Sequence, residues 1–312
     1  MNLTSPIFTD ADAARAHLES LQWANGRACP HCGTVDNSVE LKGKSTRPGV
    51  YKCRDCRKPF SVTVGTLFER SHIPLNKWLL AVHLLCASKK GMSSHQLMRM
   101  LDVTYKTAWF MSHRIREAMA PGSDVPPMGS DGGAVEADET YIGRKKGVAY
   151  RAGGGAHKMK IVTLLDRDSG HARSTVIPER MTQDKVSKIV RDNVAREARL
   201  MTDESLLYKK VGLEMAGHHA VNHSKDEYVR VEDIVITTNT VEGFFSIFKR
   251  GMRGVYQHCG EQHLQRYLRE FDFRYSHRIA NGVNDTQRAE KALAGIVGKR
   301  LTYRRIDGLQ AA

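Results

Sequence analysis

Two short cysteine pairs constrain the fold of this chain more than any other feature. Cys29 and Cys32 form the first Cys-x-x-Cys pair, and Cys53 and Cys56 form the second. Each pair aims two thiolates at one point, so the two pairs together predict a tetrahedral sulfur site for Zn²⁺. Four sulfurs leave no coordination position open, and the expected zinc is therefore structural. Redox cysteines or a chance pairing are the alternatives.

The residues around the second pair predict the strands of a zinc ribbon. Tyr51 precedes the pair, and Phe60, Val62 and Val64 follow it with the period-two alternation of a strand. His31 lies inside the first pair, but four sulfurs already close the site, so we do not expect it to be a ligand. The remaining cysteines stand alone, which argues against a disulfide framework.

Length and charge indicate several domains and a polyanionic partner. A chain of 312 residues suggests two or more domains. Lys and Arg number 48 against 34 Asp and Glu, a net charge of +14 that suits a polyphosphate such as DNA. A merely basic protein is the alternative. Neither a signal peptide nor an apolar run of about 18 residues is present, so we expect a cytoplasmic protein with no membrane partner.

The N-terminal half predicts helices on both sides of the ribbon. Residues 1–25 have helical spacing, and an apolar stripe runs along a helix from Leu75 to Cys86. Ser93 and Thr104 are the expected N-caps of a short and a longer helix, which is the layout of a helix-turn-helix. The second helix of that motif enters the major groove, and an ordinary three-helix connector is the alternative. The candidate DNA contacts on it are Tyr105, Lys106, His113 and Arg114.

Beyond a turn-rich linker, the pattern changes to strands and helices. Three strands, at 135–141, 160–165 and 171–177, predict an antiparallel meander. A helix is expected over 183–196, a short buried strand ends at Asp203, and a further strand covers 219–223. Another helix begins near Asn239. The last stretch, from about 279, has weak periodicity and is expected to be a loosely ordered tail.

Three acids in this half are candidates for a metal site. Asp138 lies on a strand, Asp203 at a strand end and Glu242 at a helix start, and hard cations prefer such oxygen ligands. Glu242 and Lys249 are seven residues apart, close to two helical turns, so both can face one site. Each acid also has a plain structural explanation as a cap or first-turn acid. The rival acids, expected to be solvated charges, are Asp166, Asp168, Asp226, Glu227 and Glu232.

Several motifs resemble the DDE transposases of bacterial insertion sequences, in the branch that places a zinc ribbon before the catalytic domain. They are Ala-Asp-Glu-Thr-Tyr-Ile-Gly at 137–143, Thr-Asp at 202–203, Val-Asn-His-Ser at 221–224, Asn-Thr-Val-Glu-Gly-Phe-Phe-Ser-Ile-Phe-Lys-Arg-Gly at 239–251 and Tyr-Leu-Arg-Glu-Phe-Asp-Phe-Arg-Tyr at 267–275. The resemblance runs from about residue 21 to residue 278. It is weakest over 144–158, where a glycine-rich insertion obscures the register.

The resemblance implies a multidomain α+β chain with a mixed sheet in a ribonuclease H-like α/β domain. The expected parts are an N-terminal helical segment (1–25), the zinc ribbon (26–68), the helix-turn-helix (72–120), the linker (121–134), the catalytic domain (135–278) and the tail (279–312). It implies that Asp138, Asp203 and Glu242 bind catalytic Mg²⁺ or Mn²⁺, with Lys249 as the basic residue that follows. Asn239 is the less favoured third ligand.

The implied function is DNA transposition by metal-dependent strand cleavage and strand transfer. The implied partners are double-stranded DNA, at element ends and target, and further copies of the chain on that DNA. Additional DNA contacts are expected from Arg144, Lys145, Lys146, Arg250 and Arg253. The alternatives are a DNA-binding regulator or domesticated transposase with an inactive second half, and a nuclease that only hydrolyses.

Overall fold

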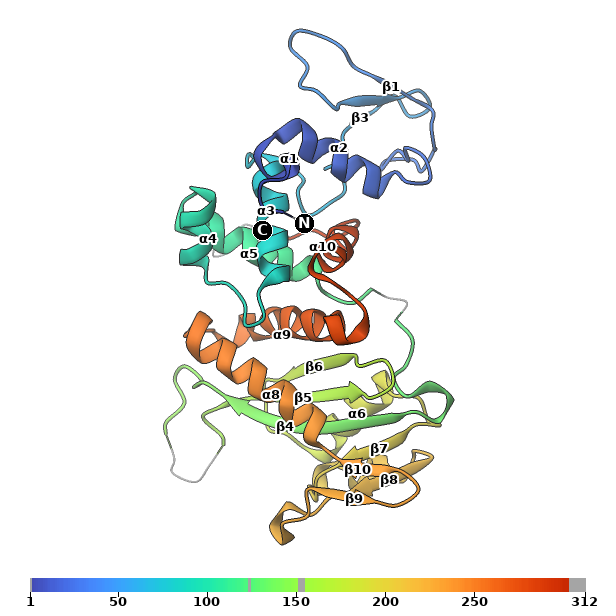
Figure 1. Cartoon of the computed structure of the whole chain (residues 1–312), viewed down its shortest axis with the longest axis vertical. Coiled ribbons are helices and arrows are strands. Elements are labelled where there is room, and N and C mark those ends of the chain that lie inside the picture. The colour runs from blue at the N-terminus through green and yellow to red at the C-terminus, as the bar shows by residue number, and fades with distance from the viewer. Residues whose placement is uncertain (1, 123–124, 151–154, 303–312) are drawn as a thin grey trace, which may run out of the picture. The chain divides into compact units, whose positions relative to one another are not determined.

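The computed structural model describes residues 2–122, 125–150 and 155–302 (Figure 1). Residues 123–124 of the expected linker, 151–154 of the glycine-rich insertion and the end of the expected tail lie outside the described residues. The described chain divides into two compact units. The first comprises residues 2–88, 92–119 and 284–302, and the second comprises 89–91 and the described part of 120–283.

The first unit begins with two helices and a small sheet. Helices α1 (Pro6–Thr9) and α2 (Ala11–Gln22) confirm the helical start, and the Asp10 side chain caps α2. Three short antiparallel strands follow in the order β1-β2-β3. Their bounds are Ser38–Glu40 for β1, Tyr51–Cys53 for β2 and Pro59–Phe60 for β3. The strands expected around the second cysteine pair are confirmed at Tyr51 and Phe60. The strand expected to continue through Val62 and Val64 is shorter, because β3 ends at Phe60 and the chain turns there.

Three helices follow at the expected places: α3 (Leu75–Ala87), α4 (Ser94–Leu101) and α5 (Tyr105–Ala118). The Ser93 hydroxyl accepts a hydrogen bond from the Gln96 amide, and the Thr104 hydroxyl accepts one from the Thr107 amide. Asp102 takes a left-handed conformation and ends α4. Both predicted N-caps are thus confirmed. The buried surface of α3 is wider than the single apolar stripe that the sequence predicted. This helix is buried on several sides, and even His83 is buried.

The C-terminal segment corrects the expectation of a loose tail from residue 279. Helix α10 (Asp285–Ala294) begins at an Asn284–Gln287 capping box and packs against α3. Beyond it, the Leu67 amide donates to Ile296 O and the Gly298 amide donates to Gly65 O. The described part of this segment is an integral layer of the first unit. The helix is short and the helix that it packs against lies far away in the sequence, so the local pattern alone did not reveal this packing.

The second unit is built on a five-stranded mixed sheet with the order β6-β5-β4-β7-β8. The antiparallel meander is confirmed as β4 (Ala134–Ile142), β5 (Met159–Asp166) and β6 (Ala172–Ile177). Strands β7 (Arg199–Thr202) and β8 (Gly217–Ala220) continue it in parallel. Strand β8 begins and ends earlier than the expected strand over 219–223, and a 3-10 helix begins at His223. The order and directions are those of a ribonuclease H-like sheet.

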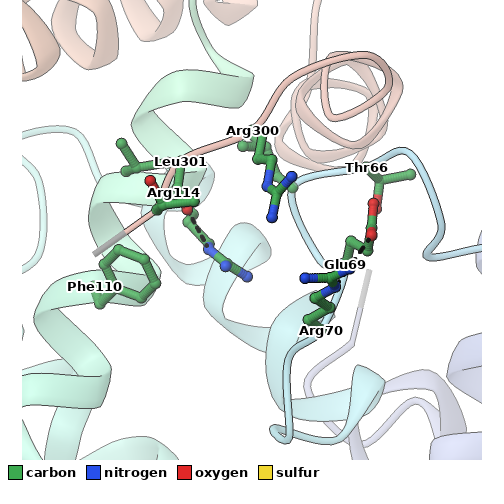
Figure 2. A pocket seen from close by; sticks show the side chains of 9 residues that line it. Thr66, Glu69, Arg70, Phe110, Arg114, Arg300 and Leu301 are labelled. Atoms are coloured by element: carbon green, nitrogen blue, oxygen red, sulfur yellow. Dashed lines mark hydrogen bonds and ion pairs between the residues drawn. The ribbon is translucent and has the colours of Figure 1, made fainter. Parts of the chain in front are cut away.

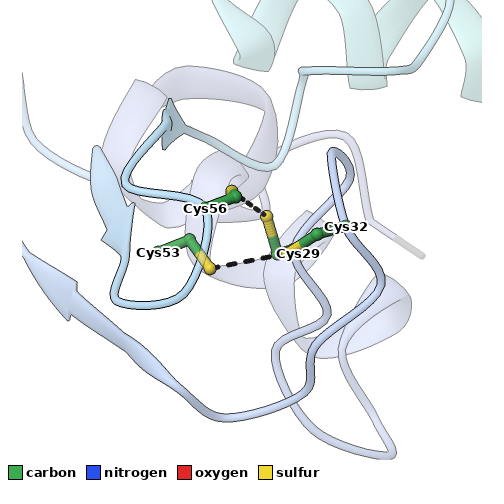
Figure 3. A group of neighbouring side chains, drawn as sticks. All are labelled: Cys29, Cys32, Cys53 and Cys56. Carbon is green, nitrogen blue, oxygen red and sulfur yellow. Dashed lines mark hydrogen bonds between the residues drawn. The ribbon is translucent and has the colours of Figure 1, made fainter.

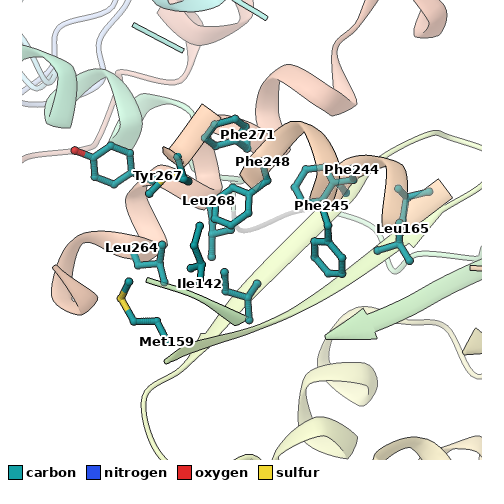
Figure 4. Close-up of a cluster of buried hydrophobic side chains, with 14 residues drawn as sticks. Ile142, Met159, Leu165, Phe244, Phe245, Phe248, Leu264, Tyr267, Leu268 and Phe271 are labelled. Atoms are coloured by element: carbon teal, nitrogen blue, oxygen red, sulfur yellow. The ribbon is translucent and has the colours of Figure 1, made fainter. Parts of the chain in front are cut away.

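Helices cover both faces of this sheet. Helices α8 (Asn239–Gly251) and α9 (Glu261–Ser276) pack on one face, where Phe244, Phe248 and Phe271 join side chains of β4 and β5 in a single apolar core (Figures 1 and 4). Helix α6 (Gln183–Asn193), shorter than expected, packs on the other face. Period-two alternation along β4 therefore places Asp138 on the α8 side, with Glu136 and Ile142.

Other short elements of the second unit were not expected. Strands β9 (Val229–Val231) and β10 (Val235–Thr237) form an antiparallel hairpin before α8. The remaining elements are η1 (Ser130–Gly132), η2 (Leu206–Tyr208), α7 (Lys209–Gly212), η3 (His223–Lys225), the π-helical η4 (Met252–Tyr256) and η5 (Ile279–Asn281). Among the described residues, no helix is long and apolar enough to cross a membrane.

Candidate zinc and carboxylate sites

The four paired cysteines meet at one point of the first unit (Figure 3). The Cys29 and Cys56 sulfurs are 3.7 Å apart, the Cys32 and Cys53 sulfurs are 3.6 Å apart, and all four lie within 4.8 Å of one another. Zinc–sulfur bonds of about 2.3 Å in a tetrahedron place the sulfurs about 3.8 Å apart. The donor set therefore fits a structural zinc ion and is too open for disulfides. His31 is exposed, and its ring nitrogen approaches Pro59 O, outside the ligand set.

The sheet places Asp138 on β4 and Asp203 directly after the end of the neighbouring strand β7. Strands β4 and β7 run parallel, and Glu136 pairs with Met201 at the last position of their register. Asp138 lies two residues beyond Glu136, and Asp203 lies two residues beyond Met201. Neighbouring strands are about 4.8 Å apart, so the two aspartates extend from the same end of the sheet, side by side.

A buried ion pair fixes the start of α8 above β4. Glu136 is fully buried, and its Oε1 lies 2.7 Å from Arg167 Nε. Its Oε2 accepts a hydrogen bond of 2.9 Å from the Val241 amide in the first turn of α8. Arg167 also donates to Thr237 O at the end of β10. Glu242, the residue after Val241, is thereby held near the strand that carries Asp138.

The Glu242 carboxylate lies at the surface of this site. Its side chain is 45% exposed, and its Oε1 accepts a hydrogen bond of 3.0 Å from the Thr238 hydroxyl. His223 Nε2 lies 3.5 Å from the same oxygen. Asp203 accepts a hydrogen bond from the Ser205 amide. The histidine therefore lies beside the Glu242 carboxylate, and it belongs to the Val-Asn-His-Ser motif at 221–224.

Electrostatics link the three acids and Lys249. Burial, and after it the nearby charges of Asp203, Glu139 and Glu242, raise the pKa of Asp138 to about 7. Burial also raises the pKa of Asp203. Burial lowers the pKa of Lys249, and the charge of Asp138 opposes that change. These groups therefore feel one another's charge, and the carboxylates repel each other when no cation is present.

The three acids are less tightly gathered than the cysteines. Among the described residues, the cysteines alone form a group of three or more potential ligands close enough to hold a metal ion as they stand. Glu139, next to Asp138, points to the opposite face of the sheet, where Tyr208 donates a hydrogen bond of 2.9 Å to its carboxylate. Of the rival acids, Asp166 is not the solvated charge expected: it is buried and accepts a hydrogen bond from the Gly129 amide.

The candidate DNA contacts divide into exposed and covered residues. Tyr105 is 45% exposed and its ring stacks on His95. His113 is buried against Trp109, and Lys145 lies 2.5 Å from Glu261, so neither is the exposed contact expected. The sequence shows the helix but not which neighbours cover its later turns. The other exposed candidates are Lys106, Arg144, Lys146, Arg250 and Arg253, and Arg114 is half-buried.

Two separate stretches of the chain match the models of known domains. Residues 9–59 match the model of a transposase zinc-ribbon domain, and residues 131–276 match that of an ISXO2-like transposase domain. A similar protein is described as an uncharacterized protein in transposable element ISH50 of Halobacterium salinarum. It is 29% identical over 289 residues, which cover 86% of this chain and 92% of that protein.

Two solved structures are only weakly similar to this chain. One is a simian T-cell lymphotropic virus intasome in complex with the PP2A regulatory subunit B56 gamma, with a TM-score of 0.29, 13% identity and coverage of 56% of this chain and 63% of that one. The other is a Drosophila P element transposase strand transfer complex, with a TM-score of 0.28, 10% identity and coverage of 72% and 64%. This chain thus spans less than two thirds of either, and such low scores do not define its fold. The two matched domains, in this order, make the chain a member of the DDE-type transposases that carry a zinc ribbon before a ribonuclease H-like domain.

Proposed function

We propose that this transposase binds the ends of its element and cuts and joins DNA strands with divalent metal held by Asp138, Asp203 and Glu242. The observation that carries the proposal is the parallel pairing of β4 with β7, because it brings two aspartates to one end of the sheet. The Glu136–Val241 hydrogen bond supports Glu242 as the third ligand. Asn239, whose side chain is exposed, is the less favoured choice.

The chemistry follows from the charges at this site. Two Mg²⁺ or Mn²⁺ ions, when bound, activate the attacking oxygen and stabilise the leaving oxygen of a phosphodiester. The three carboxylates hold the positive charge in place and lose their mutual repulsion as they do so. Lys249, on the Glu242 side of α8, binds and orients a phosphate oxygen. Water is the first attacking group, and the freed 3′ hydroxyl is the second.

The first unit supplies DNA binding in this proposal. The ribbon and the α4–α5 pair bind the DNA at the element end, and Tyr105 and Lys106, in the N-terminal turn of α5, lie nearest the base edges. Arg144, Lys146, Arg250 and Arg253 contact backbone phosphates near the carboxylates. Two or more copies assemble on the DNA, so that both ends are joined to one target, and the reaction takes place in the cytoplasm.

A strand-cleavage assay tests the proposal. The substrate is a labelled duplex taken from the sequences that flank the gene, with Mg²⁺ or Mn²⁺ and a supercoiled plasmid as target. Asp203→Asn should abolish cleavage while duplex binding, measured by fluorescence anisotropy, persists. Asp192→Asn, an exposed acid on α6, is the matched control and should cut normally.

Three outcomes would change the assignment. Equal loss of binding and cleavage in Asp203→Asn would contradict the division of labour between the two units. Cleavage by the unaltered protein without any joined product would favour a nuclease. Binding without metal-dependent cleavage would favour a regulator.

A further inference from the structure

A pocket of about 270 Å³ lies within the first unit and is lined by three arginines. Figure 2 shows the guanidinium groups of Arg70, Arg114 and Arg300 pointing into the same space. The volume is roughly nine times the share of one water molecule in the liquid, enough for a tetrahedral oxyanion with some solvent. Residues from three distant parts of the chain therefore converge on one positively charged hollow.

The pocket is fixed by backbone pairing. Thr66 forms a bridge with Val297, and the Gly298 amide donates a hydrogen bond of 2.9 Å to Gly65 O. Arg114 Nε donates one of 3.3 Å to Leu301 O, and its guanidinium lies 4.8 Å from the centre of the Phe110 ring. The segment after α10 thus forms one wall of the pocket and brings Arg300 to it.

The charges in this pocket are not balanced. Among the described residues that line it, Glu69 is the only acid, and it lies 3.7 Å from Arg70 Nε. Glu69 also accepts a hydrogen bond from the Gly65 amide. Burial lowers the pKa of Arg114, and the charge of Arg300 lowers it further, so these two cations are close enough to repel. An anion between them would relieve that repulsion.

We propose that this pocket binds a phosphate group of the DNA backbone. The proposal rests on DNA binding by the first unit, as proposed above. The planar guanidinium presents several donors in a fork that matches phosphate oxygens. Phe110 and Arg114 lie on α5, one and two turns after Lys106 along the same side of the helix. A strand that contacts the start of α5 therefore has a second anchoring point here.

The proposed role differs from base reading. A phosphate contact fixes the register of the protein on the duplex and carries no sequence information of its own. Arg114 is half-buried beside a backbone carbonyl, which suits a fixed phosphate contact better than an insertion into the groove. We therefore expect the pocket to contribute equally to binding of all duplex sequences.

The test measures the salt dependence of duplex binding by the full zinc-loaded chain. Each phosphate contact contributes about 0.9 to the slope of log K against log salt. Arg300→Gln should lower that slope by about 1 and weaken binding roughly eightfold at 0.1 M salt, for specific and unrelated duplexes alike. Arg300→Lys should keep most of the slope. Arg196→Gln, an exposed arginine of the second unit, removes the same charge outside the pocket and should leave the slope unchanged.

The outcomes are distinguishable. We expect Arg300→Gln to have the zinc content and melting temperature of the unaltered chain, which would show that it is folded. Arg114→Gln provides a second variant of the pocket. An unchanged slope in both variants, or an equal loss in Arg196→Gln, would overturn the pocket assignment while leaving DNA binding intact. A second result would also overturn it: inorganic phosphate raises the melting temperature of the unaltered chain but not that of Arg300→Gln, while the salt dependence of DNA binding is the same in both. The pocket would then bind a free anion. Failure of the unaltered chain to bind any duplex would instead overturn the proposed function.

Discussion

Arg167 Nε lies 2.7 Å from Glu136 Oε1, and this buried ion pair ties the first turn of α8 to the central strand of the sheet. Glu136 uses its second oxygen for the Val241 amide, and Arg167 reaches the end of β10. The pair thus holds three segments together directly beside Glu242. Neither residue belongs to the proposed triad, so both are positioning residues.

Removing one partner of this pair should destabilise the second unit. Arg167→Gln leaves the Glu136 charge buried without its cation, which costs about 3–5 kcal/mol of unfolding free energy. Arg191→Gln, which breaks the exposed pair with Glu214, should cost less than about 1 kcal/mol. Thermal denaturation compares the two. An equal loss of stability in the two variants would show that the ion pair between Glu136 and Arg167 does not stabilise the fold more than an exposed pair does.

Asp138→Asn should make the metal-free protein more stable. Burial and the neighbouring acids raise the pKa of Asp138 to about 7. Its folded value lies above its unfolded value, so its charge opposes folding increasingly as pH rises toward 7. The neutral amide removes that cost, by at least about 1 kcal/mol at pH 8. A lower melting temperature for the variant would contradict this account.

Mn²⁺ should stabilise the unaltered chain and leave Asp138→Asn nearly unaffected. A cation that binds only the folded carboxylates stabilises the folded chain by RT ln(1 + c/Kd), where c is the Mn²⁺ concentration, so the melting temperature rises with that concentration. The shift is measured by thermal denaturation at increasing Mn²⁺, with Asp192→Asn as the control that keeps the response. A full response in Asp138→Asn would exclude this residue as a ligand.

Asp272 should make stability depend on pH. It accepts hydrogen bonds from the Ser174 amide and hydroxyl, which favour the charged form, but burial dominates and raises its pKa to about 7. Because the folded pKa exceeds the unfolded one, stability falls as pH rises from about 4 to 7, by at most about 1.4 kcal/mol per pH unit. Asp272→Asn should gain stability relative to the unaltered chain across pH 5.5–7 and level off above 7. A constant difference would contradict the pKa assignment.

Cys53→Ser should remove zinc and unfold the ribbon. Cys53 is fully buried among the apolar side chains of the ribbon, and a site with three thiolates binds the ion more weakly. The zinc content measured by metal analysis should fall from one ion per chain to far less, and the affinity for duplex DNA should fall with it. Cys259→Ser is the matched control and should keep its zinc. Full zinc in Cys53→Ser would contradict the ligand set.

Local patterns in the sequence predicted much of the fold. Cysteine spacing, the caps Ser93 and Thr104, and period-two alternation each depend on residues close together in the chain, and the ribbon, the helix starts and the meander are confirmed. The strand position of Asp138 and the strand-end position of Asp203 also follow from local pattern. That they lie side by side depends on the β4–β7 register, which no local pattern determines.

The features that the sequence did not reveal depend on distant partners. Glu136 shares the face of Asp138, and an acid within a strand that is buried needs a cation, but nothing local identifies Arg167 as that cation. The same holds for α10, which packs mainly against the distant helix α3, and for His113, which is buried by neighbours of α5. The pocket around Arg300 was hidden because its wall lies in the segment expected to be a tail.

Anomalous diffraction from crystals that contain Mn²⁺ and a duplex of the element end shows which carboxylates bind the catalytic metal. We expect a manganese peak about 2.1 Å from carboxylate oxygens of Asp138 and Asp203, close to the usual Mg²⁺–oxygen distance, with Glu242 as a further ligand. Manganese bound by other acids, with Asp138 and Asp203 left without metal in a complex that still cleaves DNA, would contradict this expectation.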